Sequence, residues 1–81
     1  MNREEAEILS QKIVNILKYK RIELGISKLE ISQKTGMSRT AITLIENGQN
    51  SPTLRSLFML SSCLNINLED VLKEAKAHTN K

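Results

Sequence analysis

The chain has 81 residues, of which 40% are hydrophobic and only 2% aromatic, and its net charge is +3 at pH 7. We expect one small domain over residues 1–77, without room for a separate catalytic or ligand-sensing domain, and a disordered tail at residues 78–81. No apolar run reaches ~18 residues and no basic-then-apolar leader is present, so we expect a soluble, cytoplasmic protein. Cys63, the single cysteine, excludes an internal disulfide and suits a reducing compartment.

The positive charge is concentrated in the middle of the chain. Residues 12–55 hold eight basic and three acidic side chains. Residues 1–11 hold one basic and three acidic side chains, and residues 56–81 hold three of each kind. Such a distribution is typical of a surface that faces phosphates. An ordinary solvated face explains the charge equally well, so charge alone does not decide between the two.

Apolar periodicity predicts five helices, near residues 4–24, 28–35, 39–47, 54–64 and 68–77. A capping side chain precedes each expected helix, namely Asn2 with Glu5, Ser27 with Glu30, Ser38, Thr53, and Asn67 with Asp70. A residue suited to a left-handed stop follows each of the first four, namely Gly25, Gly36, Gly48 and Asn65. No segment alternates with a period of two residues. We therefore predict an all-α fold, a compact bundle of five helices.

The second and third expected helices form the most informative stretch, SKLEISQKTGMSRTAITLIE, residues 27–46. One helix begins after Ser27, stops at Gly36, and a new helix begins after Ser38, which is the outline of a helix-turn-helix. Residues at helical spacing converge between the two helices: Ile31, Thr35, Ile42 and Ile45, with Met37 filling the turn and a small Ser32 where the helices cross. The pattern predicts a second helix shaped to enter the major groove of DNA.

The last two expected helices carry apolar stripes. Leu54, Leu57, Leu60, Ser61 and Leu64 form the stripe of one, and Leu68, Val71, Leu72 and Ala75 that of the other. The second stripe is wider than one neighbouring helix needs to cover, so we predict that it forms a homodimer interface, to which Ile8 and Leu9 can add. A monomer whose stripe packs wholly onto its own helices is the alternative. Leu29 and Leu44 fall outside the stripes, and we expect both to be exposed toward a partner.

From about Arg21 to Leu72, the sequence resembles the lambda repressor and Cro-type helix-turn-helix proteins, also called the xenobiotic-response-element family. The shared residues, in the family's order and spacing, are Gly25, Ser27, Ile31, Gly36, Ser38, Ile42, Glu46, Gly48, Pro52, Leu57 and Leu64. The resemblance implies a compact all-helical domain, usually dimeric, that binds a partly palindromic operator and represses or activates transcription. It also implies that Arg21 pairs with Glu46 and thereby pins the first helix to the third.

Four positions depart from the family pattern. Lys28 replaces a Gln that touches the DNA backbone in relatives; lysine keeps the attraction to phosphate but loses the directed amide contacts. Ser32 and Ser61 replace alanines and remain small. Leu44 stands where relatives often carry a polar base-reading side chain, and it can either touch a thymine methyl group or be structural.

The resemblance assigns two sets of DNA-binding residues. Arg39, Thr40, Thr43 and Leu44 are the candidates for contact with bases, and Arg39 can donate two hydrogen bonds to guanine. Lys28, Ser38, Gln49, Asn50, Lys34 and Arg55 are the candidates for contact with phosphates, together with the amides at the starts of the second and third helices. An Arg39 that is only solvated is the alternative, and the motif around it favours the base-reading role.

Other classes of function fit the sequence less well. One His in the tail, one Cys on an apolar helix and no paired carboxylates leave nothing for catalysis, so we predict no enzyme, no metal site and no cofactor. The serious alternative is an antitoxin-type module that neutralises a partner protein and represses its own operon. A lone domain without a sensor also suggests regulation by concentration, as in Cro-like repressors or the controller proteins of restriction–modification systems.

Overall fold

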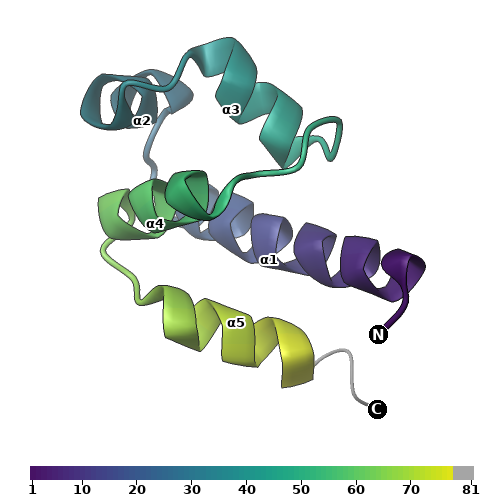
Figure 1. Cartoon of the computed structure of the whole chain (residues 1–81). Helices are drawn as coiled ribbons and strands as arrows, with labels where there is room; N and C mark the ends of the chain where they lie inside the picture. Colours follow the sequence, from purple (N-terminus) through teal and green to yellow (C-terminus); the bar gives the residue numbers. More distant parts are fainter. Residues whose placement is uncertain (78–81) are drawn as a thin grey trace.

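A computed structural model describes residues 1–77, which form five helices: α1 (Arg3–Glu23), α2 (Lys28–Thr35), α3 (Arg39–Glu46), α4 (Leu54–Cys63) and α5 (Leu68–Ala77) (Figure 1). No strand occurs in these 77 residues. The predicted all-α fold and its five helices are confirmed, with each predicted end within one residue of the observed end. The tail predicted at residues 78–81 lies outside the described residues.

The helices begin where the capping residues predict. Asn2 and Glu5 form a complete capping box, and the Oγ atoms of Ser38 and Thr53 accept hydrogen bonds from the amides three residues later. Ser27 Oγ likewise accepts from the amide of Glu30 at 3.0 Å, but the Glu30 carboxylate pairs with Lys34 one turn further on. The predicted Ser27–Glu30 capping box is therefore only half formed.

Interactions between neighbouring residues also fix the end of α4 and the start of α5. Asn67 Oδ1 accepts a hydrogen bond from the amide of Glu69 at 3.0 Å, rather than acting together with Asp70. Asn65 takes the left-handed conformation expected of it, with φ +56°, and lets the chain reverse between α4 and α5. This reversal brings α5 beneath α4 and alongside α1 (Figure 1).

One apolar core joins all five helices. Ile31 of α2 and Ile42 of α3 are fully buried, and they meet side chains from the other three helices: Ile13, Leu17, Leu60, Leu64, Leu68, Val71 and Ala75. In Figure 1, the α2–α3 pair lies on one side of α4, and α5 lies on the other side. The core therefore holds α2 and α3 together at one end of the molecule. None of the described helices is both long and apolar enough to cross a bilayer.

The stripe predicted as inward-facing on α4 needs one correction. Leu57, Leu60, Ser61 and Leu64 lie at least partly inside, but Leu54 is 65% exposed. Successive helical residues are rotated by about 100°, which places Leu54 at the edge of the stripe, on the same side as Phe58. Phe58 is 57% exposed, so α4 presents two large apolar side chains to solvent.

The contact surface predicted on α5 also needs correction. Leu68, Val71 and Ala75 belong to the core of the single chain, each at most 7% exposed, and Leu72 is half-buried against it. The stripe is not left over for a second chain because α1, at 21 residues, is long enough to cover it (Figure 1). Of the predicted residues, only the half-buried Leu72 can contribute to an interface between copies, together with side chains outside this stripe. Of the other side chains expected outside the stripes, Leu29 is 47% exposed, whereas Leu44 is half-buried.

Candidate nucleic-acid interface

The turn between α2 and α3 is fixed by hydrogen bonds of its own residues. Gly36 closes α2 in the left-handed conformation, with φ +79°, and its amide donates to the carbonyl of Ser32 at 2.9 Å. The Thr35 hydroxyl donates to the carbonyl of Ile31 at 2.8 Å and accepts from the amide of Met37 at 3.1 Å. The sequence predicts Thr35 only as a packing residue, so its role in the turn is an addition from the structure.

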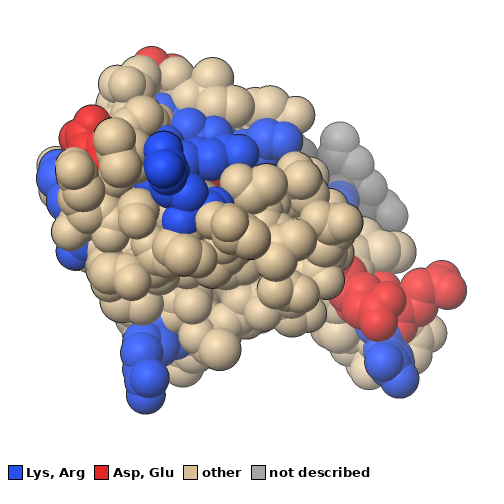
Figure 2. All heavy atoms as spheres, turned by 90° about the horizontal axis from the view of Figure 1, so that it is seen from above, with Lys and Arg blue, Asp and Glu red and all other residues tan. Residues whose placement is uncertain are grey.

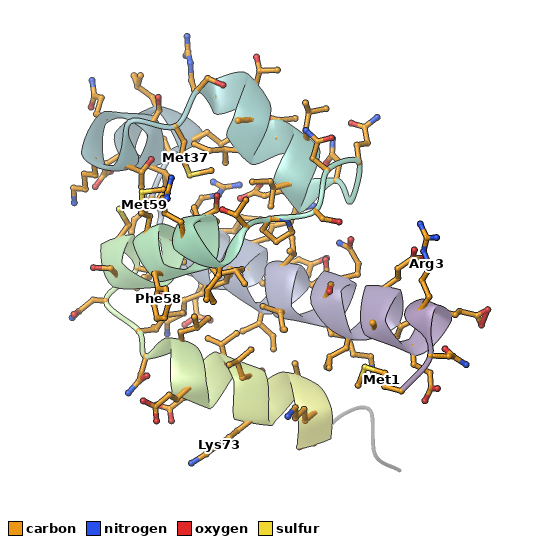
Figure 3. The ribbon with its side chains drawn as sticks, viewed as in Figure 1. Met1, Arg3, Met37, Phe58, Met59 and Lys73 are labelled. Carbon is orange, nitrogen blue, oxygen red and sulfur yellow. The ribbon has the colours of Figure 1, made fainter. Side chains whose placement is uncertain are left out.

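Met37 secures the same turn from below. Its side chain is half-buried and packs on the apolar core, between the α2–α3 turn and α4 (Figure 3). This confirms the prediction that Met37 fills the turn. The hydrogen bonds around Gly36 and the packing of Met37 together set the angle between the two helices, so α3 is presented in one orientation.

A buried ion pair holds the far end of α3. Arg21 of α1 donates from Nε and Nη2 to the two carboxylate oxygens of Glu46, at 2.7 and 3.0 Å, and from Nη1 to the carbonyl of Ile26 at 2.9 Å. The two side chains are 13% and 10% exposed. The implied Arg21–Glu46 pair is therefore confirmed, and it ties α1, the α1–α2 turn and α3 at one point.

The start of α3 is open to solvent on one side only. Ser38, Arg39 and Thr40 are exposed, whereas Ile42 and Ile45 are buried and turn the opposite side of the helix to the core. Thr43 and Leu44, one turn along, are half-buried at the edge of the exposed side. The four residues predicted to contact bases thus occupy the outer half of one helix, with Arg39 and Thr40 projecting furthest.

Lys28, a predicted phosphate contact, lies across the two helices. Its Nζ atom donates to Thr43 Oγ1 at 3.0 Å, so the first residue of α2 meets the middle of α3. Both side chains are half-buried. This contact joins a predicted phosphate-binding residue to a predicted base-reading one, and it is not foreseen from the sequence.

The loop after α3 carries Gln49 and Asn50, which are both exposed. Their amides donate to the carbonyl of Leu44 at 2.9 and 3.1 Å, so the loop folds back on the end of α3. Gly48 has φ +76°, and a Cβ there would lie 2.5 Å from Gln11 Oε1 of α1. The loop is thus seated closely on α1, which fixes Gln49 and Asn50 beside the end of α3.

The remaining two predicted phosphate contacts differ in position. Arg55 is exposed in the first turn of α4, directly after the α3–α4 loop. Lys34 is also exposed, but it pairs with Glu30 at 3.4 Å and borders a hollow lined by Phe58, Met59 and Cys63 of α4. Arg55 therefore follows α3 along the chain, whereas Lys34 precedes α3 and forms an ion pair within α2.

The charge of the molecule matches this arrangement. Figure 2 views the α2–α3 end directly and shows Lys and Arg side chains gathered over the middle of that face. Acidic side chains gather instead at the edge that holds the N-terminus of α1, where Glu4 and Glu5 belong to the first turn. Basic side chains thus gather on the face of the molecule that α2 and α3 form, and such a surface attracts phosphates.

Known proteins are similar to this chain in sequence. The sequence pattern of the family described as "Helix-turn-helix" matches residues 17–71, which run from the second half of α1 into α5. The chain belongs to this helix-turn-helix family. The match includes the Arg21–Glu46 pair, the turn at Gly36 and the whole of α3.

Individual relatives are consistent with the family assignment. An uncharacterized HTH-type transcriptional regulator of Methanocaldococcus jannaschii is 32% identical over 57 residues, which are 70% of this chain and 86% of that protein. The 10 kDa protein of the ImmF control region of Bacillus phage phi105 is 35% identical over 63 residues, 78% of this chain and 69% of that protein. An HTH-type transcriptional regulator of Archaeoglobus fulgidus is 29% identical over 51 residues, 63% of this chain and 73% of that protein. The family is one of DNA-binding transcriptional regulators.

Two hollows lie away from the helix-turn-helix. One, of about 670 Å³, runs between α4 and α5, and the exposed Leu54 and Phe58 form part of its lining with Leu72. Phe58 projects from the α5 side of α4, whereas Met59 projects from the α2 side (Figure 3).

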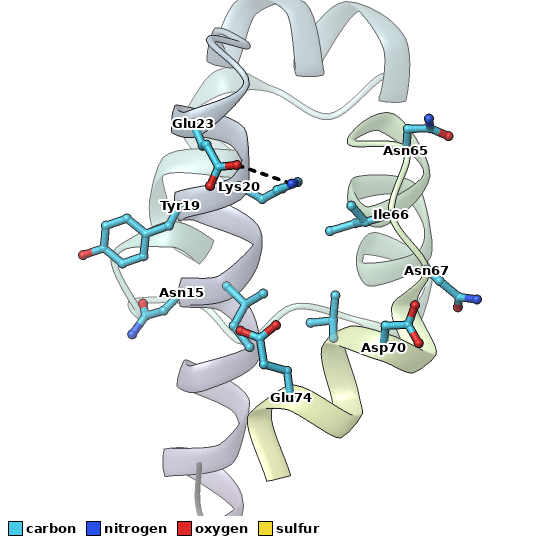
Figure 4. A pocket seen from close by; sticks show the side chains of 11 residues that line it. Asn15, Tyr19, Lys20, Glu23, Asn65, Ile66, Asn67, Asp70 and Glu74 are labelled. Atoms are coloured by element: carbon cyan, nitrogen blue, oxygen red, sulfur yellow. Dashed lines mark hydrogen bonds and ion pairs between the residues drawn. The ribbon is translucent and has the colours of Figure 1, made fainter. Parts of the chain in front are cut away.

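The other hollow, of about 780 Å³, opens between α1 and α5. Figure 4 shows Tyr19 and Glu23 on its α1 wall, and Asn67 and Asp70 on the opposite wall. Within residues 1–77, no group of three or more His, Cys, Asp or Glu side chains is placed to hold a metal ion.

Proposed function

We propose that this chain is a cytoplasmic, sequence-specific transcriptional regulator that binds a partly palindromic operator as a homodimer and represses transcription by occupying it. The observation that carries the proposal is the outer face of α3, where Arg39 and Thr40 are exposed while the opposite face is buried and the helix end is held by the Arg21–Glu46 pair. A helix fixed in this way can enter the major groove without first becoming ordered.

The contacts with bases follow from the exposed side chains of α3. Arg39 can donate two hydrogen bonds to O6 and N7 of a guanine, and Thr40 can bond a base edge or a phosphate. Leu44 and the Thr43 methyl group lie where they can pack on a thymine methyl group. These four side chains share the exposed side of one short helix, so they read adjacent base pairs of one half-site.

The contacts with phosphates flank this helix. Lys28 and Ser38 stand at the starts of α2 and α3, where backbone amides also point out of the helix, and Gln49 and Asn50 stand beyond the end of α3. Arg55 extends the same row from the first turn of α4. Phosphate contacts on both sides of the reading helix fix its position in the groove but carry no sequence information.

The proposed homodimer uses a surface that shares only Leu72 with the one predicted on α5. A single helix reads only a few base pairs, and two copies on a two-fold axis read half-sites about 34 Å apart. We place the interface on the exposed Leu54 and Phe58 and on the half-buried Leu72, which border the hollow between α4 and α5. This surface begins directly after the α3–α4 loop, so a second copy seated there extends the DNA-facing side.

Sedimentation at micromolar concentration tests this interface. We expect wild type to be a dimer and a Phe58→Glu variant to be a monomer, because the substitution places a charge in an apolar contact. A Tyr19→Glu variant, which changes an exposed aromatic residue beside the other hollow, is the matched control and should remain dimeric. A wild-type chain that stays monomeric, both free and on DNA, would contradict the homodimer.

A second function, the binding of a partner protein as an antitoxin-type module, is favoured by one observation. Large apolar side chains are exposed around the junction of α1 and α2, namely Tyr19, Ile22, Leu24 and Leu29. Of these, Tyr19 also lines the α1–α5 hollow, whose walls carry Glu23, Asp70 and Glu74 (Figure 4). A basic, partly apolar protein segment fits this surface, which leaves the face of α3 free for DNA.

One experiment separates the two functions. Purified wild-type protein is mixed with a duplex taken from upstream of its own gene, and binding is followed by gel shift against an excess of shuffled duplex. We expect a specific shift by the protein alone, and an Arg39→Ala variant of unchanged helicity should lose the preference for the upstream duplex. Equal binding of both duplexes by wild type would reject the proposed regulator. A specific shift that appears only with a partner protein would support the second function.

A further inference from the structure

The contact between Lys28 and Thr43 has a consequence for which bases α3 can accept. Thr43 Oγ1 receives a hydrogen bond from the Lys28 ammonium group at 3.0 Å, and both side chains are half-buried. A hydroxyl group has one proton to donate and two lone pairs to accept with. Because the ammonium group occupies a lone pair and carries a positive charge, it favours the arrangement in which the Thr43 proton points away from Lys28.

The Thr43 proton is not used inside the protein. Thr35, the corresponding threonine near the end of α2, donates its proton back to the carbonyl of Ile31 four residues earlier. Such back-bonding is common for threonine within helices. Across residues 1–77, Lys28 is the hydrogen-bonding partner of the Thr43 side chain, and it is a donor. The hydroxyl proton of Thr43 is therefore available to a group outside the chain.

We propose that Lys28 is a positioning residue that turns Thr43 into a hydrogen-bond donor toward DNA, so that the base facing Thr43 must present an acceptor. This inference rests on the proposed function. In the major groove, guanine presents N7 and O6, adenine N7 and thymine O4, whereas cytosine presents only its N4 amino donor. The pair thus selects against cytosine at one position of each half-site.

Lys28 also couples this choice to the backbone. An ammonium group has three N–H donors, of which Thr43 takes one. The other two can reach a phosphate while Thr43 faces a base. Lys28 can therefore bind the DNA backbone and orient the Thr43 hydroxyl group at the same time. A Gln at this position would offer a neutral amide that both donates and accepts, and it would therefore leave the Thr43 proton free to point either way.

The test is selection of duplexes from a randomised library by wild type and by four variants. We expect Lys28→Met and Thr43→Val to lose discrimination against cytosine at one and the same position, by about two- to tenfold, the effect of one hydrogen bond. Lys28→Arg and Thr43→Ser retain the donor pair, and they should retain the discrimination. The preference at the position read by Arg39 should be unchanged in all four, which shows that the fold and the docking are intact.

Salt dependence supplies a second readout. Lys28→Met should lower the log–log slope of affinity against salt by about 0.9 for each phosphate that Lys28 neutralises. Lys73→Met is the matched control, since it removes the same charge from an exposed side chain that points away from α2 and α3 (Figure 3). It should leave both the slope and the base preferences as in wild type.

The possible failures can be told apart. If wild type selects a sequence but Lys28→Met discriminates against cytosine as wild type does, the role of Lys28 is refuted and the proposed regulator stands. If Lys28→Met relaxes every position equally, Lys28 only contacts phosphate or supports the fold, and the inference is again refuted. If wild type selects no sequence at all, the proposed regulator and the inference fail together.

Discussion

Removal of the Glu46 carboxylate should destabilise the fold more than any other single loss of charge in the described chain. In Glu46→Ala, Arg21 loses two hydrogen bonds of 2.7 and 3.0 Å and keeps only the carbonyl of Ile26. Breaking a buried ion pair from one side costs about 3–5 kcal/mol. Since the two side chains are 13% and 10% exposed rather than fully buried, we expect the lower end, ~3 kcal/mol. At 4–8 °C for each kcal/mol, the melting temperature should fall by roughly 12–24 °C.

Thermal unfolding followed by circular dichroism measures this effect, and two further variants control it. Glu7→Ala removes the carboxylate of an exposed pair, Arg3–Glu7, whose side chains are 94% and 69% exposed, and should cost under about 0.5 kcal/mol. Replacing both Arg21 and Glu46 by apolar residues should recover most of the loss, because no unpaired charge then stays buried. If the melting temperature of Glu46→Ala falls no further than that of Glu7→Ala, the Arg21–Glu46 pair does not hold α3 as we argue.

Substitutions at three further positions test other parts of the account. Arg39→Ala should cost ~1–3 kcal/mol of specific affinity with little change on random DNA, as measured by competition titration, whereas equal losses on both would make Arg39 a phosphate contact. Ser32→Leu should lower stability by ~1–3 kcal/mol in urea unfolding, since it forces α2 and α3 apart, and an unchanged midpoint would show that the helices cross elsewhere. Gly48→Ala should lower the free energy of unfolding by about 1–2 kcal/mol, because the backbone at this position is left-handed, and Gly48→Asn should lower it by less. Equal stability of wild type and both variants would refute the argument from φ.

The helices and their caps could be predicted from the sequence because the interactions that fix them are local. Ser38 caps an amide three residues away, and Gly36 acts through its own backbone. The Arg21–Glu46 pair spans 25 residues and was accessible only through the resemblance to a family. The local sequence pattern was therefore enough to predict the helix-turn-helix. The resemblance to the family was needed to predict the Arg21–Glu46 pair.

The remaining features depend on how whole helices cross. The contact between Lys28 and Thr43 spans 15 residues and needs the angle between α2 and α3, which no local pattern contains. The exposure of Leu54 and Phe58, and the burial of Val71, depend on where α5 packs against α4 and α1. An apolar stripe indicates that a face is covered but not by which chain, and for this reason the predicted contact surface on α5 was wrong.

Methylation interference on the selected operator tests the central claim most directly, because guanine N7 lies in the major groove. If α3 reads the groove through Arg39 in a two-fold dimer, methylation should block wild-type binding at one guanine in each half-site. The two guanines should be related by the two-fold axis, on half-sites with centres about 34 Å apart. The Arg39→Ala variant should lose the interference at both guanines. Binding by wild type that no major-groove methylation disturbs would contradict the account.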